Sequence, residues 1–230
     1  MKHKPKLVVL SGAGISAESG VATFRDSGGL WEGHNVMDVA SPEGWARNQK
    51  LVLDFYNKRR QQLLSVKPNK AHDILVELEL NFNVQIITQN VDDLHERAGS
   101  SNVLHLHGEL LKARSINNYK LISDCQADIN QGDCASDGFQ LRPHIVWFGE
   151  EVPELENAID FCVAADILVV IGTSLQVYPA AGLIDFTQPQ IPIYYIDPNP
   201  ASIANIGKRL TTIPLSATLG MTKLKTILLS

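Results

Sequence analysis

The chain has 230 residues, 44% of them hydrophobic and 20% charged, with a formal net charge of −5. This balance is typical of a folded enzyme, so a disordered or collagen-like chain is excluded, and a negative net charge disfavours nucleic acid as a partner. The length suits one large domain, or a large domain with a smaller one inserted in it.

The N-terminus is basic, MKHKPK, and leads into an apolar run at 7–10 that is too short for the core of a signal peptide. No apolar stretch reaches the length of about eighteen residues that a membrane-spanning helix needs. The three cysteines are Cys125, Cys134 and Cys162, and an odd number without a secretory signal favours free thiols over disulfides. We therefore expect a cytoplasmic protein that does not bind membranes.

Apolar runs rich in β-branched residues alternate with helical patterns along the chain. Strands are predicted at 7–10, 84–88, 167–171 and 191–196. Helices are predicted at about 50–65, 69–80, 91–98, 154–165 and 179–187, and at the C-terminus. Because the strands are apolar on both faces and helices separate them, we predict a parallel sheet covered on both sides, an α/β fold. Residues 112–141 are polar and rich in Asn, Asp and Gly, which predicts an inserted module.

A glycine-rich loop, SGAGISA, follows the first predicted strand and fits the pattern G-x-G-x-x-[G/A] through Gly12, Gly14 and Ala17. Glycines let backbone N–H groups approach a pyrophosphate, and the N-terminus of a following helix favours its negative charge. The alternative is a simple tight turn between strand and helix.

An ordinary dehydrogenase would place a second strand ending in an acidic residue about twenty positions after this loop. The chain instead reads GVATFRDSGGLWEG, which predicts a long ordered loop folded over a ligand. Phe24 could cover a ring and Arg25 could pair with a phosphate, although either could simply anchor the loop.

A second polar cluster, Gln89, Asn90 and Asp92, follows the strand predicted at 84–88 and should face the glycine loop. Capping of the next helix is the alternative for Asn90 or Asp92. Further on, His105 and His107 should share one face of a strand, a spacing that also suits a metal pair, but no third ligand is evident. Although such histidines are often structural, His107 is the better catalytic candidate because it ends the strand.

Five motifs in this order resemble the sirtuin family, the NAD-dependent protein lysine deacylases. They are GAGISAESGVATFRD, TQNVDDLHERAG, HLHGEL, RPHIVWFGE and IGTSLQVYPAAG. The resemblance covers nearly the whole chain. It implies a single catalytic domain over 1–230, with a Rossmann-like core of about 1–30, 80–108 and 145–230 and smaller inserted segments of about 31–79 and 109–144.

The resemblance implies a reaction in which the acyl-lysine oxygen attacks C1′ of the nicotinamide ribose, giving nicotinamide, 2′-O-acyl-ADP-ribose and free lysine. Asn90 and Asp92 would position the reactants, and His107 would accept the proton of the ribose 2′-hydroxyl, since an imidazole has an unperturbed pKa of about 6.5. The residues expected to bind NAD are Gly12, Ala13, Gly14, Ser16, Ala17, Phe24, Arg25, Trp31, Gln89, Asn90, Asp92, His107, Gly172, Thr173, Ser174, Asp197, Asn199 and Ala217.

The partners implied are acylated lysine side chains of proteins, bound by a chain that acts as a monomer. The substrate peptide would pair as a strand with backbone edges, which tolerates many sequences. The flanking residues are Val146, Trp147, Phe148, Gly149, Glu150, Val177 and Tyr178.

Tyr56 and Arg59 are three residues apart in the helix predicted at 50–65 and should share a face. A solvated basic face is the alternative, and we expect it for Lys58 and Arg60. The pair resembles the sirtuin branch that removes acidic acyl groups, because a guanidinium beside a phenol can bind a succinyl or malonyl carboxylate. Ala40 matches a small residue that leaves room for such chains. We expect desuccinylation and demalonylation, together with deacetylation.

Most sirtuins hold a structural zinc with two C-x₂-C pairs, which three scattered cysteines cannot supply. We therefore expect no zinc. A small apolar core is predicted to hold the inserted module instead, formed by Ile116, Tyr119, Leu121, Ile122 and Phe139. A loose module would impair substrate placement more than NAD binding.

Three alternative functions remain. A sirtuin-like NAD hydrolase or mono-ADP-ribosyltransferase would leave Tyr56 and Arg59 without a role. A non-catalytic sensor of NAD or ADP-ribose would not need His107 and Asn90. A conventional dehydrogenase would need the acidic ribose-binding residue that the glycine loop lacks.

Overall fold

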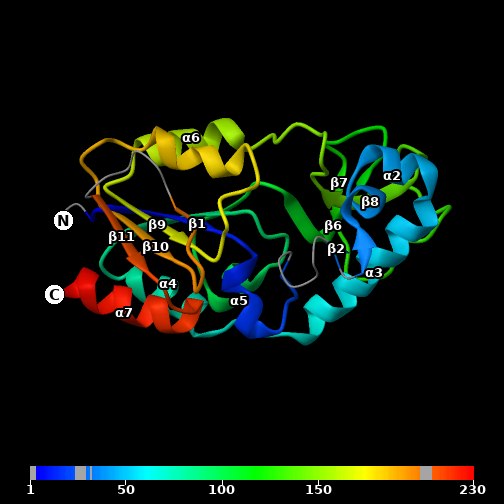
Figure 1. Ribbon diagram of the computed structural model, residues 1–230. Helices are drawn as coiled ribbons and strands as arrows, with labels where there is room; N and C mark the ends of the chain where they lie inside the picture. Colours follow the sequence, from blue (N-terminus) through cyan, green and yellow to red (C-terminus); the bar gives the residue numbers. More distant parts are fainter. Residues whose placement is uncertain (1–3, 24–29, 32, 203–208) are drawn as a thin grey trace.

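The structure is a computed structural model that describes residues 4–23, 30, 31, 33–202 and 209–230. The molecule is elongated, with a large sheet at one end and a smaller sheet at the other (Figure 1). Strand β1 near the start of the chain and helix α7 at its end both lie at the end of the molecule with the large sheet, and the chain passes to the smaller region and back between them. The inserted module predicted from the sequence thus forms a spatially separate part of the described fold.

Six parallel strands form the large sheet in the order β11-β10-β9-β1-β4-β5. Their bounds are β1 Lys6–Ser11, β4 Asn83–Thr88, β5 Val103–His105, β9 Ile167–Ile171, β10 Ile193–Ile196 and β11 Leu210–Ile213. β1 lies at the centre, where Leu10 aligns with Ile87 of β4 on one side and with Val170 of β9 on the other. The chain therefore leaves β1 in one direction for β4 and later returns to its other side for β9.

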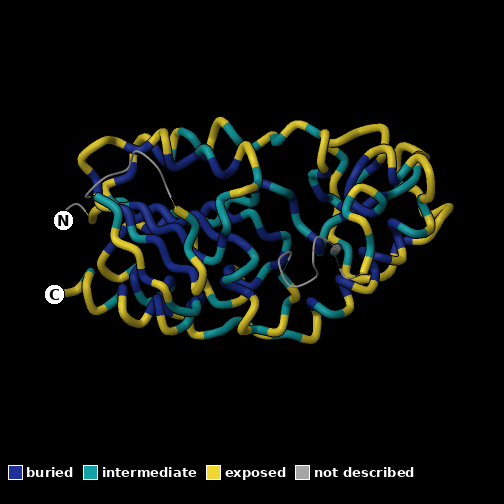
Figure 2. Tube along the Cα trace, in the orientation of Figure 1, coloured by how far each residue is buried: buried dark blue, intermediate teal, exposed yellow. Residues whose placement is uncertain are grey.

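Alternate residues of β1 enter two different hydrophobic cores, because successive side chains of a strand point to opposite faces. Leu7 and Val9 pack on the side of α4 (Lys70–Leu78) and α7 (Ala217–Leu229). Val8 and Leu10 pack on the side of α6 (Leu155–Val163) and the 3₁₀ helix η3 (Ala180–Phe186). Figure 2 shows the buried strands enclosed between these layers. The predicted α/β fold with a covered parallel sheet is confirmed.

The remaining helices of the described ranges lie between β1 and β5 along the chain. Their bounds are η1 Ala13–Ile15, η2 Ala17–Ser19, α1 Val36–Val39, α2 Pro42–Arg47, α3 Gln49–Ser65 and α5 Leu94–Ala98. Asn48 and Asn69 set the starts of α3 and α4, because each side chain accepts a backbone N–H of the first turn. The helix expected after the glycine loop consists of two short 3₁₀ helices, η1 and η2.

The smaller region contains a three-stranded antiparallel sheet in the order β7-β6-β8. The strands are β6 Gly108–Ser115, β7 Ile122–Asp124 and β8 Leu141–Ile145, and β2 (Leu30–Trp31) pairs with β3 (His34–Asn35) nearby. We call residues 108–145 the small module. Helix α3 packs beside it (Figure 1).

The predicted apolar core of the small module is wrong. Four of its five members are exposed at 41–46% of their surface, namely Ile116, Tyr119, Ile122 and Phe139, and Leu121 is only half-buried. The core forms instead between Leu53 of α3, Ala113 of β6 and Ile129. Ala113 alternates with outward residues along β6, so the module buries the face turned to α3 rather than its own loop residues.

A polar contact joins α3 to the same core. The Asn57 side chain accepts the Ile129 N–H and donates to the Ile129 carbonyl, both at 2.9 Å. Arg60 donates to Asn57 Oδ1 at 2.8 Å and to the Leu110 carbonyl at 3.1 Å. We call this arrangement the Asn57 clasp. The expectation that Arg60 lies on a solvated face is wrong, because its side chain is fully buried, whereas Lys58 is exposed.

None of the helices in the described ranges is long and apolar enough to cross a membrane.

Candidate active site

Three loops meet at the carboxyl end of the large sheet, where the chain has passed to both sides of β1. Gly14 N–H donates to the Gly172 carbonyl at 2.8 Å, and Gln89 N–H donates to the Ser11 carbonyl at 2.9 Å. The Gln89 side chain also donates to Thr173 Oγ1 at 3.1 Å. Such a crossing point is where open parallel sheets bind ligands, so the structure brings the predicted glycine loop, the Gln89 turn and the Gly172 turn together.

The glycines of this site are needed because two backbones touch. A Cβ atom on Gly14 would lie 2.6 Å from Gly172 Cα, and one on Gly12 would lie 2.8 Å from the Gly172 carbonyl oxygen. Gly172 itself has φ +62°, a conformation that side chains disfavour. Ala13 and Ala17, which were also predicted here, occupy η1 and η2.

Ser16, Asn90 and Asp92 form a buried polar cluster beside the loop. The Ser16 hydroxyl donates to Asp92 Oδ2 at 3.0 Å and accepts from Asn90 Nδ2 at 3.1 Å. Asp92 Oδ1 accepts the Leu94 N–H at 3.2 Å, so the capping alternative also holds for this residue. Burial raises the pKa of Asp92, while its hydrogen bonds from Leu94 and Ser16 oppose that rise.

His107 lies in the turn between β5 and β6, close to the Gln89 turn. Its Nδ1 faces the Gln89 carbonyl at 3.1 Å, and a carbonyl can only accept, so Nδ1 carries the hydrogen and Nε2 keeps its lone pair. Burial lowers the pKa of His107, against the opposing effect of the Gln89 hydrogen bond. The ring is therefore neutral near pH 7 and can act as a proton acceptor.

The prediction that His105 and His107 share the face of one strand is wrong. Strand β5 ends at His105, and Leu106 and His107 form the turn before β6 begins at Gly108, whose φ is +79°. The two rings consequently contact different backbone carbonyls, that of Asn90 and that of Gln89.

Tyr56 and Arg59 lie on the buried side of α3 among aromatic rings. The Arg59 guanidinium lies 4.6 Å from the centroid of Trp31 and 5.7 Å from that of Phe55. Tyr56 Oη accepts the indole N–H of Trp147 at 3.1 Å. Burial raises the pKa of the Tyr56 phenol, so its hydroxyl stays protonated. The two residues therefore present a positive charge and a neutral hydroxyl from one helix face.

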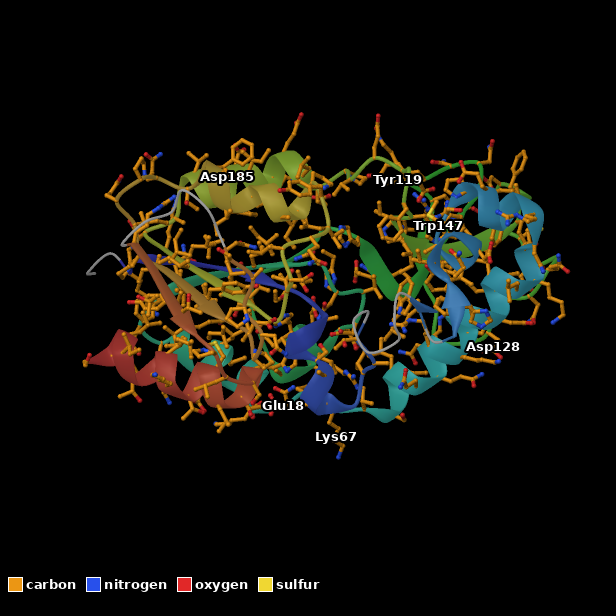
Figure 3. All side chains as sticks on the ribbon, viewed as in Figure 1. Glu18, Lys67, Tyr119, Asp128, Trp147 and Asp185 are labelled. Carbon is orange, nitrogen blue, oxygen red and sulfur yellow. The ribbon has the colours of Figure 1, made fainter. Side chains whose placement is uncertain are left out.

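Residues 146–150 connect the His107 turn to the segment around Ala40. Val146 N–H donates to the His107 carbonyl at 2.9 Å, and Phe148 N–H donates to the Ala40 carbonyl at 3.0 Å. Ala40 is buried, whereas Phe148 and Gly149 are exposed. Trp147, labelled in Figure 3, lies inside this end of the molecule.

The Glu150 side chain stabilises the loop of residues 146–150 through contacts within this part of the molecule. Its carboxylate accepts the Trp147 N–H at 2.8 Å and forms an ion pair with Arg142 at 2.6 Å. The Arg142 guanidinium also lies over the Trp147 ring, at 3.2 Å from the centroid. Arg142 and Glu150 thus fix the ring whose N–H reaches Tyr56.

The structure describes most of the remaining predicted residues. Asp197 follows β10, is buried, and accepts the N–H of the exposed Asn199 at 2.8 Å. Ser174 and Val177 are half-buried, and Tyr178 is 75% exposed. Phe24 and Arg25 lie outside the described residues.

Ala217 is the first residue of α7 and packs in the core on the α4 side. Its neighbours Ser216 and Thr218 hydrogen-bond to Glu18, which follows the glycine loop (Figure 3). Sequence reasoning gave Glu18 no role. Nothing local could reveal it, because the bond spans almost the whole chain.

No cluster of three or more His, Cys, Asp or Glu side chains that could hold a metal ion occurs within the described ranges. Cys125, Cys134 and Cys162 are free thiols.

The parallel sheet, the loops at its crossing point and the inserted module define an α/β enzyme of the dinucleotide-binding type. The Sir2 family model matches residues 12–179. The chain is 59% identical over 211 residues to an NAD-dependent protein deacylase of Helicobacter pylori, covering 92% of each. It is 52% identical over 229 residues to an NAD-dependent protein deacylase of Bacteroides thetaiotaomicron, covering 97% of each.

A crystal structure of a Sir2 homologue in complex with NAD is 37% identical, with a TM-score of 0.87 over 97% of this chain and 89% of that one. The chain belongs to the Sir2 family.

Proposed function

We propose that the chain is an NAD-dependent protein lysine deacylase that removes succinyl and malonyl groups and also removes acetyl groups. The observation that carries the deacylase assignment is the neutral His107 ring, held through Nδ1 by the Gln89 carbonyl beside the buried Ser16, Asn90 and Asp92 cluster. The relatives named above support the use of NAD and of acylated protein substrates.

The donor set of the site fits NAD. Gly12, Gly14 and Gly172 carry no Cβ and so leave room at the crossing point, which suits the close approach of a pyrophosphate, while the Gly12 and Gly14 N–H groups hold the turn by donating to the Ile171 and Gly172 carbonyls. The amide of Asn90 and the carboxylate of Asp92 can pair with a carboxamide and with ribose hydroxyls. When bound, NAD supplies the ribose carbon to which the acyl oxygen is transferred. Asn90 and Asp92 then orient the reactants, and His107 Nε2 takes up a hydroxyl proton.

The acidic-acyl preference is supported by the surroundings of Arg59. Its side chain is buried among rings, and a buried guanidinium is strongly stabilised by a carboxylate that reaches it. The Tyr56 hydroxyl accepts from Trp147 and therefore keeps its own hydrogen to donate. An acetyl group has no carboxylate and can use neither residue.

The proposal is tested by NAD-dependent turnover of matched succinyl-, malonyl- and acetyl-lysine peptides, followed by nicotinamide release. Losing a hydrogen bond to a charged group is worth about 1.5–3 kcal/mol, so Arg59→Met should lower kcat/KM for the succinyl peptide roughly 10- to 150-fold relative to the acetyl peptide. Tyr56→Phe should change the ratio in the same direction. His107→Ala should abolish turnover of every peptide.

Three outcomes would contradict the proposal. If Arg59→Met lowers succinyl and acetyl turnover equally, the acidic-acyl preference is wrong. If the wild type releases nicotinamide at the same rate without any acyl peptide, the protein is an NAD hydrolase. Transfer of ADP-ribose to a protein side chain would identify a mono-ADP-ribosyltransferase.

A further inference from the structure

The ring of His105 lies between two hydrogen-bond acceptors. Its Nδ1 faces the Asn90 carbonyl at 3.2 Å, and its Nε2 faces Glu96 Oε1 at 2.7 Å. A neutral imidazole has one N–H and can donate to only one of these oxygens. Only the doubly protonated imidazolium satisfies both, so the geometry selects a positively charged ring.

His107 provides the contrast two residues further on. It faces a single carbonyl, that of Gln89 at 3.1 Å, which a neutral ring satisfies completely. The motif HLHGEL therefore contains one histidine held charged and one held neutral. A metal pair is disfavoured because His105 Nε2 already contacts Glu96 Oε1 at 2.7 Å, and the described part of the chain has no group of three His, Cys, Asp or Glu side chains that could hold a metal ion.

His105 contacts the backbone of the residue whose side chain enters the candidate active site. The Asn90 carbonyl meets His105, while the Asn90 amide meets Ser16, which in turn bonds to Asp92. Asp92 is a buried carboxylate, and the charge of His105 opposes the effect of burial by lowering the pKa of Asp92. The ring thus affects both the position of Asn90 and the ionisation of Asp92.

The titratable groups around the ring come from α5, the turn before it and β6, and His95 among them is neutral. Glu96 and His95 belong to α5, Asp92 precedes α5, and Glu109 lies on β6. Burial alone would lower the pKa of His105, but the Glu96 hydrogen bond and the charges of Glu96 and Glu109 raise it above the ordinary value. The nearest of these groups is Glu96, whose carboxylate forms the ion pair at 2.7 Å.

We propose that the Glu96–His105 ion pair is a positioning unit of this enzyme, in which the charged imidazole holds the Asn90 backbone and keeps Asp92 ionised. The inference rests on the roles proposed above for Asn90 and Asp92. His105 and Glu96 do not touch the reacting atoms, and they act through Asn90 and Asp92, which do.

The unit has a defined pH dependence. A histidine whose pKa is raised in the folded protein is charged below that pKa and loses its charge as the pH rises through it. Activity should therefore decline on the alkaline side as His105 loses its second proton. Removing the charge of Glu96 lowers the pKa of the ring and moves this decline to lower pH.

The experiment compares pH profiles of kcat/KM for NAD in the wild type, Glu96→Gln, His105→Gln and Glu109→Gln. Glu96→Gln should move the alkaline decline down by about one pH unit, the usual effect of removing an adjacent opposite charge. Glu109→Gln is the matched control, because it removes the same charge without a hydrogen bond to the ring, and it should shift the decline less. His105→Gln should lose the decline and lower kcat/KM roughly 10- to 100-fold through misplacement of Asn90.

A ¹⁵N NMR measurement on the free protein gives a second readout. Both ring nitrogens of His105 should carry hydrogen at pH 7, whereas His107 should carry one. A neutral His105, or a Glu96→Gln profile that superimposes on the wild type, overturns the proposal.

Failure of the proposed function gives a different result. In that case the wild type turns over no acyl-lysine peptide, and the NMR measurement together with NAD binding at different pH values decides the role of the pair. Normal wild-type turnover with an unshifted decline refutes the positioning unit alone.

Discussion

Replacing Asn57 by alanine should separate the small module from α3. The side chain makes three hydrogen bonds: one each with the N–H and the carbonyl of Ile129, and one with Arg60. Asn57 is 7% exposed and Ile129 is 2% exposed, so water cannot simply replace the lost partners. Alanine leaves two backbone groups and one guanidinium N–H without their bonds.

The size of the effect follows from these groups. A buried polar group that loses its partner lowers the free energy of unfolding by about 1–3 kcal/mol. Two backbone groups lose their partners here, and because the structure relaxes partly around them we expect a total loss of about 3 kcal/mol. For a chain of 150–250 residues each kcal/mol lowers the melting temperature by about 2–4 °C, which predicts a decrease of about 6–12 °C.

The assay is thermal unfolding together with hydrogen exchange at the Ile129 amide. The matched control is Lys58→Ala, the exposed neighbour on the same helix, which should change stability by less than about 0.5 kcal/mol. A melting temperature of Asn57→Ala within about 2 °C of that of Lys58→Ala would mean no net effect on stability. In that case the Asn57 clasp does not hold the module.

Two further predictions concern acid stability and the glycine loop. Burial lowers the pKa of His72 to about 4 and that of His95 well below its usual value, so both rings must stay neutral in the folded state. Stability should therefore be complete above about pH 6.5 and fall as the pH drops toward 4, by about 3 kcal/mol for His72. The difference between the urea midpoints at pH 7 and 4.5 should be smaller in His72→Gln than in the wild type, with the remainder due to His95, and an unchanged acid loss in that variant would contradict this. Gly14→Ala should weaken NAD binding at least about tenfold because its Cβ meets the Gly172 backbone at 2.6 Å, whereas Gly182→Ala, with no neighbour nearer than 3.8 Å, should bind normally in calorimetry.

The large sheet could be predicted because its strands carry their own signal. The runs predicted at 7–10, 84–88 and 167–171 are apolar on both faces and agree with β1, β4 and β9. Of the edge strands, β11 (Leu210–Ile213) was missed, whereas a strand was expected around His105 but was taken to end at His107. The sequence of β11 is short and partly exposed, so it alternates too weakly to stand out.

The small module shows why the rest could not be predicted. Its exposed residues Ile116 and Phe139 look like core by hydrophobicity, whereas the packed residues Ala113 and Ile129 meet Leu53 from a helix far away in the sequence. Arg60 was assigned to solvent for the same reason. Which face of a short segment is buried depends on a long-range partner, and composition does not contain that partner.

The candidate site could likewise be predicted only in part from the sequence. Residue identity and spacing located the Gln89, Asn90 and Asp92 turn, because ligand-binding residues follow parallel strands. The separate protonation states of His105 and His107 needed coordinates, since both depend on which carbonyl each ring meets. Because β5 ends at His105 and not at His107, the two rings meet different backbone carbonyls.

Helix α3 carries two sets of residues on neighbouring turns. Tyr56 and Arg59 form the proposed acyl-recognition pair, while Asn57 and Arg60 anchor the small module. Because the sets alternate along one helix, a rotation or shift that re-aims one also displaces the other. Evolution of a new acyl selectivity must therefore keep the contacts that hold the small module on α3. Directed evolution of this specificity should enrich compensating substitutions around Ile129 before it reaches a new substrate.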